Sequence, residues 1–263
     1  MESEHRNNQL VRLKLEIAEH GSLSRFQHIF DDPLLVGFLR GKKFIVRDAL
    51  ECLERYIIIR TVKHAQFTKK YLLPSNATIL ENRGINILQR LDHNGRAVVF
   101  GQTKLWNTKT HTLYDTIAEH VFIVDEMLRS YLKATGSNEI VLVINFDGWT
   151  VGQASQVTPR AAMLNLDFIL KSVPIRPAAI HLINGGSLIE LLVRLVKKFM
   201  PEKIANRIFV HSNLPQLHEY LYPTILPKSL GGELEDEDAF QSELPDRIRG
   251  QEEFYRKLIQ FTD

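Results

Sequence analysis

The spacing of apolar and polar residues predicts that the first ~75 residues form a small helical bundle. Leu10, Leu13 and Ile17 recur at the spacing of one helix face. A second helix is predicted to begin at Asp31-Asp32-Pro33, because an Asp N-cap followed by Pro near the first helical position is a helix start signal. A long third helix is predicted from about Arg47 to Gln66. Its predicted core-facing residues are Leu50, Leu53, Ile57 and Ile58.

After the bundle, the pattern changes to alternating strands and helices. Two short strands, 85–91 and 96–102, are predicted to flank the Asn94-Gly95 turn, which is a strong hairpin signal. The segments that follow are predicted to be, in order, a helix (112–135), a strand (139–149), a helix from 158, a strand (178–184), a helix (188–200), a strand (207–211) and a helix (214–221). This alternation predicts an α/β unit with a largely parallel sheet. An acidic surface connector, 231–246, and a terminal amphipathic helix, about 247–261, complete the chain.

The helix predicted at 188–200 is unusually apolar around its girth. Its polar residues, Glu190, Arg194, Lys197 and Lys198, fall within a stripe roughly 100° wide. An ordinary surface helix buries a stripe of about that width and leaves the rest polar, so this helix reverses the proportion. It is therefore either a buried core helix or a lid over an apolar cavity, and periodicity leaves both open.

The turn before that helix, Gly185-Gly186-Ser187, raises the possibility of a phosphate-binding loop at a helix N-terminus. Neither GxGxxG nor GxxxxGK[ST] is present, and no lysine follows to meet a phosphate. The next predicted strand ends in His211 rather than in an acidic residue that would bind a ribose. The two glycines therefore indicate tight backbone geometry.

Motifs for covalent catalysis or metal binding are also missing. The chain has no GxSxG or HExxH motif. Asp147 ends a predicted strand, but Gly148 follows it, and an Asp-Gly pair is a common turn former. His211 and His218 flank Pro215, and each is expected to be a surface or capped histidine. These observations favour a binding protein that is not an enzyme and needs no metal or cofactor.

Composition narrows the class of protein further. The 263 residues are 44% hydrophobic and 24% charged, as in ordinary globular proteins, and the net charge of +2 gives no reason to expect nucleic-acid binding. The single cysteine, Cys52, fits a reducing compartment. No apolar run approaches the ~20 residues that span a bilayer. A cytoplasmic protein with transient peripheral membrane contact is expected.

Five segments resemble the CRAL-TRIO lipid-transfer family, most closely its branch of α-tocopherol transfer protein, cellular retinaldehyde-binding protein and the clavesins. They are DDPLLVGFLRGKKFIVRDAL (31–50), FDGWTVGQASQVTP (146–159), VPIRPAAIHLIN (173–184), FMPEKIANRIFVH (199–211) and ILPKSLGGEL (225–234). The resemblance implies a three-helix bundle (1–75), then an α/β lipid-binding domain (76–246) whose mostly parallel sheet encloses an apolar cavity. A C-terminal helix (247–263) would pack on that lobe.

The family's function implies a protein that binds a small hydrophobic ligand, such as a tocopherol or a retinoid, and transfers it between membranes. The helix at about 187–200 would then be the gate, and Gly185-Gly186 its hinge. The implied cavity and gate residues are Phe122, Ile144, Phe146, Phe168, Ile180, Leu182, Leu188, Leu191, Leu192 and Leu195. A monomer is expected. The alternative is a lipid-sensing regulatory adaptor that acts through a protein partner.

The same branch carries a basic site for phosphoinositide headgroups. Its positions fall on Lys42, Arg176, Lys203 and Arg207. Lys203 and Arg207 would share a face if their segment is helical, and such a pair suits a multivalent phosphate. This chain departs from the family pattern at Ala178, where a basic residue is expected, and at Asn145, where an acidic residue is common. Weaker headgroup binding and an altered ligand are the implied consequences.

Overall fold

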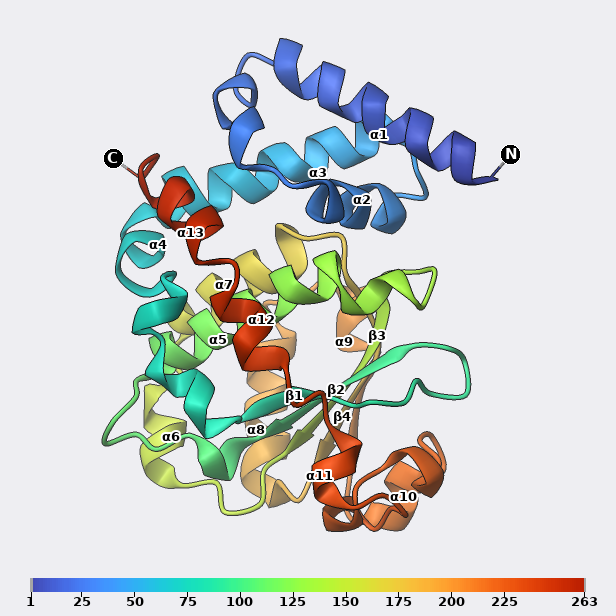
Figure 1. The fold of residues 1–263 in the computed structure, drawn as a ribbon. Coiled ribbons are helices and arrows are strands. Elements are labelled where there is room, and N and C mark those ends of the chain that lie inside the picture. The colour runs from blue at the N-terminus through green and yellow to red at the C-terminus, as the bar shows by residue number, and fades with distance from the viewer. Residues whose placement is uncertain (1, 263) are drawn as a thin grey trace.

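The N-terminal helices lie against one side of a mixed α/β lobe in the computed structural model, which describes residues 2–262 (Figure 1). The N-terminal helices are α1 (Glu2–Glu19), α2 (Asp32–Gly41), α3 (Val46–Ile58) and α4 (Ala65–Tyr71). The predicted start of α2 is confirmed, because the Leu34 backbone N–H donates to Asp31 Oδ1 at 2.7 Å. The side chains of Glu2, Ser3 and Leu188 lie outside the described residues.

The long helix predicted over 47–66 is interrupted. After α3 the chain forms a π-helical turn, Ile59–Lys63, before α4 begins. Leu53 and Ile57 are buried as predicted, but Ile58 is 43% exposed, so its assignment to the core was wrong. The widened turn places Arg60 in the interior, where its Nη2 contacts Asp125 Oδ1 at 2.9 Å. π-turns of this kind often occur where a helix serves such a specific contact.

The sheet has five strands in the order β1-β2-β3-β4-β5. They are β1 (Ile85–Ile87), β2 (Ala97–Gln102), β3 (Glu139–Asn145), β4 (Arg176–Ile183) and β5 (Ile208–His211). Strand β1 is antiparallel to β2, and the other neighbours are parallel. The largely parallel α/β sheet is therefore confirmed. Gly95 in the turn between β1 and β2 has φ +72°, as the hairpin signal requires.

Helices connect the parallel strands and cover the sheet (Figure 1). Helix α5 (Leu113–Arg129) follows β2, α6 (Val151–Gln156) and α7 (Pro159–Leu166) follow β3, and α8 (Gly186–Lys197) and α9 (Glu202–Ala205) follow β4. Helix α10 (Leu214–His218) follows β5. Within residues 2–262, no helix is long and apolar enough to cross a membrane.

Successive side chains of the central strands point to opposite faces and into different clusters. Val141 and Val143 of β3 pack with Leu217 of α10 on one face. Leu142 and Ile144 point to the other face, where Leu142 contacts both the large core and the cluster beneath α8. The candidate site lies on this second face.

The C-terminal segment forms three short helices instead of the one predicted: α11 (Asp236–Ala239), α12 (Leu244–Arg249) and α13 (Glu252–Ile259). Helix α13 packs against the N-terminal helices as well as the lobe. Phe261, just after it, lies 4.4 Å from Phe26 between ring centroids, and Tyr255 lies 5.0 Å from Phe122 of α5. One hydrophobic core thus continues from α1 to α13. The domain boundary near residue 75 stays a prediction.

Candidate functional site

An apolar floor lies on the sheet face beneath α8. Ile180 and Leu182 of β4 are buried there against Ile189 of α8. The same cluster contains the partly buried Ile144, Phe146 and Leu192, which come from β3, the loop after it and α8. Of the ten residues that the sequence assigned to the cavity and gate, the structure therefore brings five together in one cluster: Ile144, Phe146, Ile180, Leu182 and Leu192.

The packing over this floor is incomplete. Val141 and Val143, which point to the opposite face of β3, are each 1% exposed. Leu142 and Ile144 lie on the same central strand under covering helices, yet both are only half-buried. Side chains in a close-packed interior leave almost no accessible surface, so this part of the floor is covered less completely than the opposite face of β3.

Helix α8 lies over this floor. Among its described side chains, only Ile189 is fully buried, at 2% exposed. Leu191, Leu195 and Phe199 are 51%, 46% and 45% exposed, and their spacing of four residues places them in one outward-facing row. Leu191 and Leu195 therefore point away from the floor, and their assignment to the cavity and gate stays a prediction. The buried-core alternative for this helix is excluded, whereas Leu188 lies outside the described residues.

The geometry of the turn before α8 requires glycine at both Gly185 and Gly186. A Cβ on Gly185 would lie 2.5 Å from Ile189 Cβ, so only glycine lets Ile189 seat over the floor. Gly186 has φ +56°, a conformation that L-residues rarely adopt, and Asn184 before them has φ +57°. Asn184 Nδ2 donates to Asn145 Oδ1 at 3.0 Å, which ties the turn to the end of β3. These glycines serve backbone geometry.

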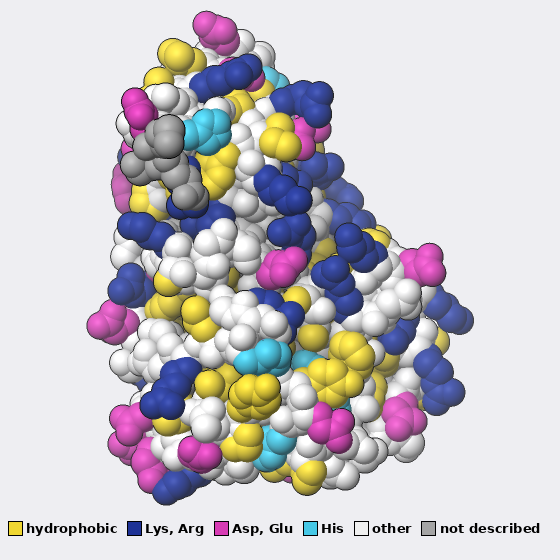
Figure 2. All heavy atoms as spheres, turned by 90° about the vertical axis from the view of Figure 1, so that its right-hand side faces the viewer, with side chains coloured by type: hydrophobic (Ala, Val, Ile, Leu, Met, Phe, Trp, Pro, Cys, Tyr) yellow, Lys and Arg dark blue, Asp and Glu magenta, His cyan; other side chains and the backbone are white. Residues whose placement is uncertain are grey.

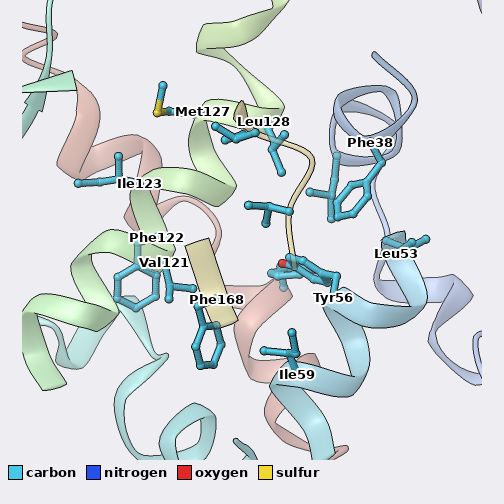
Figure 3. Packing of buried hydrophobic residues seen from close by; sticks show 14 of the residues in the cluster. Phe38, Leu53, Tyr56, Ile59, Val121, Phe122, Ile123, Met127, Leu128 and Phe168 are labelled. Carbon is cyan, nitrogen blue, oxygen red and sulfur yellow. The ribbon is translucent and has the colours of Figure 1, made fainter. Parts of the chain in front are cut away.

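Phe122 and Phe168 belong to a different part of the core. Both are 1% exposed. Phe122 meets Tyr255 edge to face, and Phe168 lies 5.2 Å from Phe67 of α4 between ring centroids. Figure 3 shows both in the packed interior that includes Tyr56 and Ile59 of the N-terminal helices. Because their rings point toward the N- and C-terminal helices, Phe122 and Phe168 lie outside the floor beneath α8.

Three polar residues that the sequence analysis missed lie where α5 meets α7. Thr116 and His120 are one turn apart on α5, and His120 Nδ1 lies 3.0 Å from Asn165 Oδ1 of α7. Burial lowers the pKa of His120, while the hydrogen bond with Asn165 opposes that effect. The i, i+4 spacing of Thr116 and His120 on an otherwise apolar helix face could have revealed them.

A second feature of the surface is a basic groove of about 320 Å³ between α2 and β4, which we call the basic groove. Lys42 and Arg176, two of the predicted headgroup residues, both line it, together with Lys43. Lys43 and Phe44 have φ of +54° and +58°, so the loop after α2 is held in an uncommon left-handed conformation. Backbone strain of this kind is often found at functional sites.

Close contact between α2 and the lobe fixes the width of the basic groove. A Cβ on Gly41 would lie 2.4 Å from Pro174 O, so only glycine permits this approach. Asn138 ties the two parts together, because its Nδ2 donates to Gly37 O at 2.9 Å and to Pro174 O at 3.1 Å. Arg40 Nε donates to Asn138 Oδ1 at 2.7 Å.

The other two predicted headgroup residues lie at different distances from the groove. Arg207 donates through Nη1 to the carbonyl of Pro177, the residue after Arg176. Lys203 is exposed on α9 and is not among the residues that line the groove. Helix α9 ends at Ala205, so the condition that one helix carries both Lys203 and Arg207 is not met.

The other polar residues considered in the sequence analysis lie in separate surroundings. Asp147 is exposed, and its nearest cation is Lys104 at 4.0 Å. His218 caps Leu230 O at 2.9 Å, as expected, but His211 is buried and lies 2.8 Å from His181, so its assignment to the surface was wrong. Among the described residues, no group of three metal-ligating side chains is placed to hold an ion.

Comparison with known proteins identifies the family. Residues 81–232 match the model of the CRAL/TRIO domain, and this range contains the sheet and α8. The chain belongs to the CRAL-TRIO family. This match confirms the resemblance seen in the sequence. It includes the branch named there, because clavesins are among the similar proteins.

Clavesin-2 from Mus musculus and from Homo sapiens is 31% identical to this chain over 206 residues, which are 78% of this chain and 62% of clavesin-2. Clavesin-1 from Rattus norvegicus is 28% identical over 214 residues, covering 78% and 58%. The match thus spans less than two thirds of the length of these relatives. The crystal structure of Sfh5 has a TM-score of 0.58 at 15% identity and covers 94% of this chain and 96% of its own, which supports the fold.

Proposed function

We propose that this protein binds a small hydrophobic lipid, such as a tocopherol or a retinoid, and transfers it between membranes. The observation that carries the proposal is the apolar floor at Leu142 and Ile144, which stays half-buried beneath a helix that has one seated residue, Ile189, and which we infer to form the ligand cleft. An apolar ligand in this cleft would remove both its own surface and the floor from water, at roughly 25 cal/mol per Å².

Helix α8 is the gate in this proposal. Leu191 and Leu195 of this helix and Phe199 just after it form an outer row, whose exposed apolar surface a bilayer would cover. Arg194 of α8 and Lys198, its C-cap residue, are exposed and would meet lipid phosphates. Binding of the row to a membrane favours the open state, because α8 gains contacts there that offset the loss of its contact with the floor.

The basic groove is the proposed site for a phosphoinositide headgroup. Figure 2 views the molecule from the right-hand side of Figure 1, and Lys and Arg side chains gather across the middle and right of this face. Lys42 and Arg176 can meet separate phosphates of one headgroup, and Arg207 lies beside them through Pro177. Ala178, where the family pattern has a basic residue, leaves this site with one cation fewer.

Lipid extraction and native mass spectrometry of the purified chain test the main proposal. We expect one lipid per chain, and transfer of labelled tocopherol, retinal or phosphatidylinositol between vesicles. A protein that is consistently empty and moves none of these lipids would refute it.

The basic groove is tested by flotation with vesicles that contain phosphatidylinositol bisphosphate. Lys42→Ala with Arg176→Ala should weaken binding about tenfold or more, since each basic residue near an anionic surface contributes about 1 kcal/mol. Lys69→Ala with Lys109→Ala removes the same charge from exposed positions outside the groove and serves as the control. Lys203→Ala with Arg207→Ala should also weaken vesicle binding. In each case, affinity for the apolar ligand should stay nearly unchanged, and equal binding by the groove variant and its control would contradict the assignment.

A further inference from the structure

Strand β5 leaves one edge of the sheet open, because it is the last strand in the order β1-β2-β3-β4-β5. The C=O of Arg207 accepts from the N–H of Ile180 at 2.8 Å, and alternate residues of a strand bond to the same neighbour, so Phe209 also bonds to β4. The N–H and C=O groups of Ile208 and Val210 therefore point away from the sheet. Among the described residues they have no hydrogen-bond partner.

The opposite edge of the sheet is covered by the chain itself. The Gln89 N–H donates to the Ala239 C=O at 2.8 Å, and the Gln241 N–H donates to the Ile87 C=O at 2.9 Å, so the C-terminal segment lies along β1. Strand β5 has no such cover, and Val210 is 39% exposed. The strand, IFVH, also lacks the lysine, proline or bulge with which natural edge strands prevent pairing. It is therefore a template for another strand.

The free groups of β5 are complementary to those of a second β5. When the two strands run antiparallel with Phe209 opposite Phe209, Ile208 of each copy stands opposite Val210 of the other. These residues carry the free groups, so they form the hydrogen-bonded pairs of an antiparallel ladder, and each outward N–H and C=O has a partner. A register shifted by one residue would set outward-facing residues against residues that already bond to β4, and it would leave groups unpaired.

The side chains of β5 also match in this register. Ile208 packs on the face of the sheet that α8 covers, and Val210, two residues on, points to the same face, so the cross-strand pairs there are apolar. Phe209 lies on the other face, with its ring centroid 5.3 Å from that of Tyr220, which is 39% exposed. Pairing would bring the Phe209 rings of the two copies together, each beside a Tyr220 that gains cover from water.

Charges at the two ends of β5 are arranged so that antiparallel pairing brings opposite signs together. In this register Arg207 stands opposite His211 of the second copy. Burial lowers the pKa of His211, and the nearby Glu219 opposes that effect, so a neutral imidazole has an exposed carboxylate close to it. Arg207 of one copy would thus meet Glu219 of the other. The contact occurs twice because the pairing is twofold, and such complementarity favours the correct register.

We propose that two copies of this chain pair through β5 and join their sheets into one. The sequence led to the expectation of a monomer, whereas the open edge favours a weak dimer. The paired strand is short, and interfaces that bury less than about 1,200 Å² are typical of transient complexes. We therefore expect a Kd of about 10–100 µM.

This dimer would present both gates to one membrane. Antiparallel strands in one sheet are related by an axis perpendicular to that sheet, so both copies of α8 lie on the same face. A single bilayer could then bind the outer rows of both copies, and the second row would bind at a high effective concentration. This consequence rests on the proposed membrane contact of α8, whereas the pairing itself does not.

The experiment measures association of the full chain in solution without lipid. Sedimentation velocity from about 1 to about 500 µM covers the expected Kd and should show a reversible monomer–dimer equilibrium. Hydrogen exchange monitored by mass spectrometry locates the contact. Peptides that cover 206–211 should exchange more slowly at concentrations above the Kd than below it, because pairing protects the outward N–H groups.

Variants at Val210 separate strand pairing from side-chain contact. Val210→Pro removes the outward N–H and leaves the bonds to β4 intact, since proline is tolerated where the N–H of an edge strand faces solvent. Val210→Lys keeps the N–H and adds a charge that opposes pairing. Each should raise the Kd about 30-fold or more, because the twofold contact loses each interaction twice. Val210→Thr keeps both the N–H and the shape, and its Kd should stay within about threefold of the wild type.

A second pair of variants tests the charges. Glu219→Arg should raise the Kd about 3- to 10-fold, because it sets two cations together in each half of the contact. Glu237→Arg makes the same change at an exposed position on α11 and should leave the Kd unchanged.

Three outcomes would overturn the pairing. They are a wild type that stays monomeric up to about 500 µM, a dimer whose Kd is the same in Val210→Pro and Val210→Lys, and a dimer in which exchange of 206–211 does not slow. Because lipid is absent from these measurements, such a failure leaves the proposed lipid transfer intact. Lipid extraction and the vesicle transfer assay test that function separately.

Discussion

Gly185→Ala should loosen the gate without otherwise disturbing the backbone. Gly185 has φ −92°, which alanine adopts freely, so backbone strain is not involved. The new Cβ would lie 2.5 Å from both Cβ and Cγ1 of Ile189. Because real Cβ atoms do not approach so closely, Ile189 must move away from the floor formed by Ile180 and Leu182.

The size of the effect follows from how α8 is held. Ile189 is 2% exposed, and it is the only fully buried side chain among those described on α8. Burial of an isoleucine is worth roughly 1.5–3 kcal/mol, and overpacking of a tight site typically costs about 1–3 kcal/mol. We therefore expect α8 to lose about 2 kcal/mol of its contact with the lobe, which raises its opening equilibrium by roughly 30-fold.

Hydrogen exchange monitored by mass spectrometry measures this opening directly. Peptides from 186–200 should exchange faster in Gly185→Ala, while peptides from β3 and α5 keep their protection. Gly186→Ala is the matched control, because nothing lies within 4 Å of its added Cβ and its cost comes from φ +56°. That backbone cost is about 1 kcal/mol and leaves Ile189 seated, so the opening should increase less. Exchange of α8 in Gly185→Ala that equals the wild type, or that is slower than in Gly186→Ala, would refute the reasoning.

Three further predictions concern buried charge. Asp125→Ala leaves Arg60 buried without its counter-ion and should destabilise the fold by about 3–5 kcal/mol in urea denaturation, whereas Tyr56→Phe, which loses one hydrogen bond to Asp125, should cost about 1 kcal/mol. Burial raises the pKa of Glu119 to about 8, so the folded state keeps a proton that the unfolded chain releases near pH 4.5. The free energy of unfolding should therefore fall as pH rises from about 4.5 to about 8. Melting curves of Glu119→Gln should lack this loss. Burial, and to a smaller extent the nearby His211, lowers the pKa of His181 to about 4. As pH falls below about 6.5, the unfolded chain therefore takes up a proton at this residue before the folded chain does. The free energy of unfolding should decline from about pH 6.5 to about pH 4, and it should decline less in His181→Gln.

The sequence is sufficient to predict the sheet because its signals are local. Apolar β-rich runs separated by helical patterns indicate parallel strands, and Asn94-Gly95 indicates the one hairpin. The end of α3 could not be predicted in the same way. Its apolar spacing continues past residue 58, and the π-turn that follows places Arg60 against Asp125, a partner 65 positions away in the chain. Nothing near Arg60 in the sequence shows that a charged residue is buried there.

The sequence predicts which side chains line the site when only one face of a strand or helix is buried. When both faces are buried, it does not show which layer a side chain contacts. Ile144, Ile180 and Leu182, which the resemblance assigned to the cavity, lie together on one face of the sheet, as the alternation along β3 and β4 requires. Helix α5, in contrast, is covered on the side of the sheet and on the side of the N-terminal helices. Periodicity shows that Phe122 is buried but does not show which layer it meets, and the same ambiguity hid the opposite position, His120.

The proposed gate and the basic groove are linked by the path of the chain. Strand β4 begins at Arg176 in the groove and ends at Ile183, about 23 Å away, where the turn to α8 begins. Helix α8 then runs back for about 17 Å, so Phe199 and the segment that carries Arg207 return to the end of the sheet where the groove lies. If a bilayer binds through a headgroup in the groove, it would meet the outer row of α8 at the Phe199 end, and the proposed hinge at Gly185-Gly186 would lie at the far end. Headgroup binding would thus place the apolar row against the membrane before the gate opens, and loss of the groove should slow ligand transfer without weakening ligand affinity.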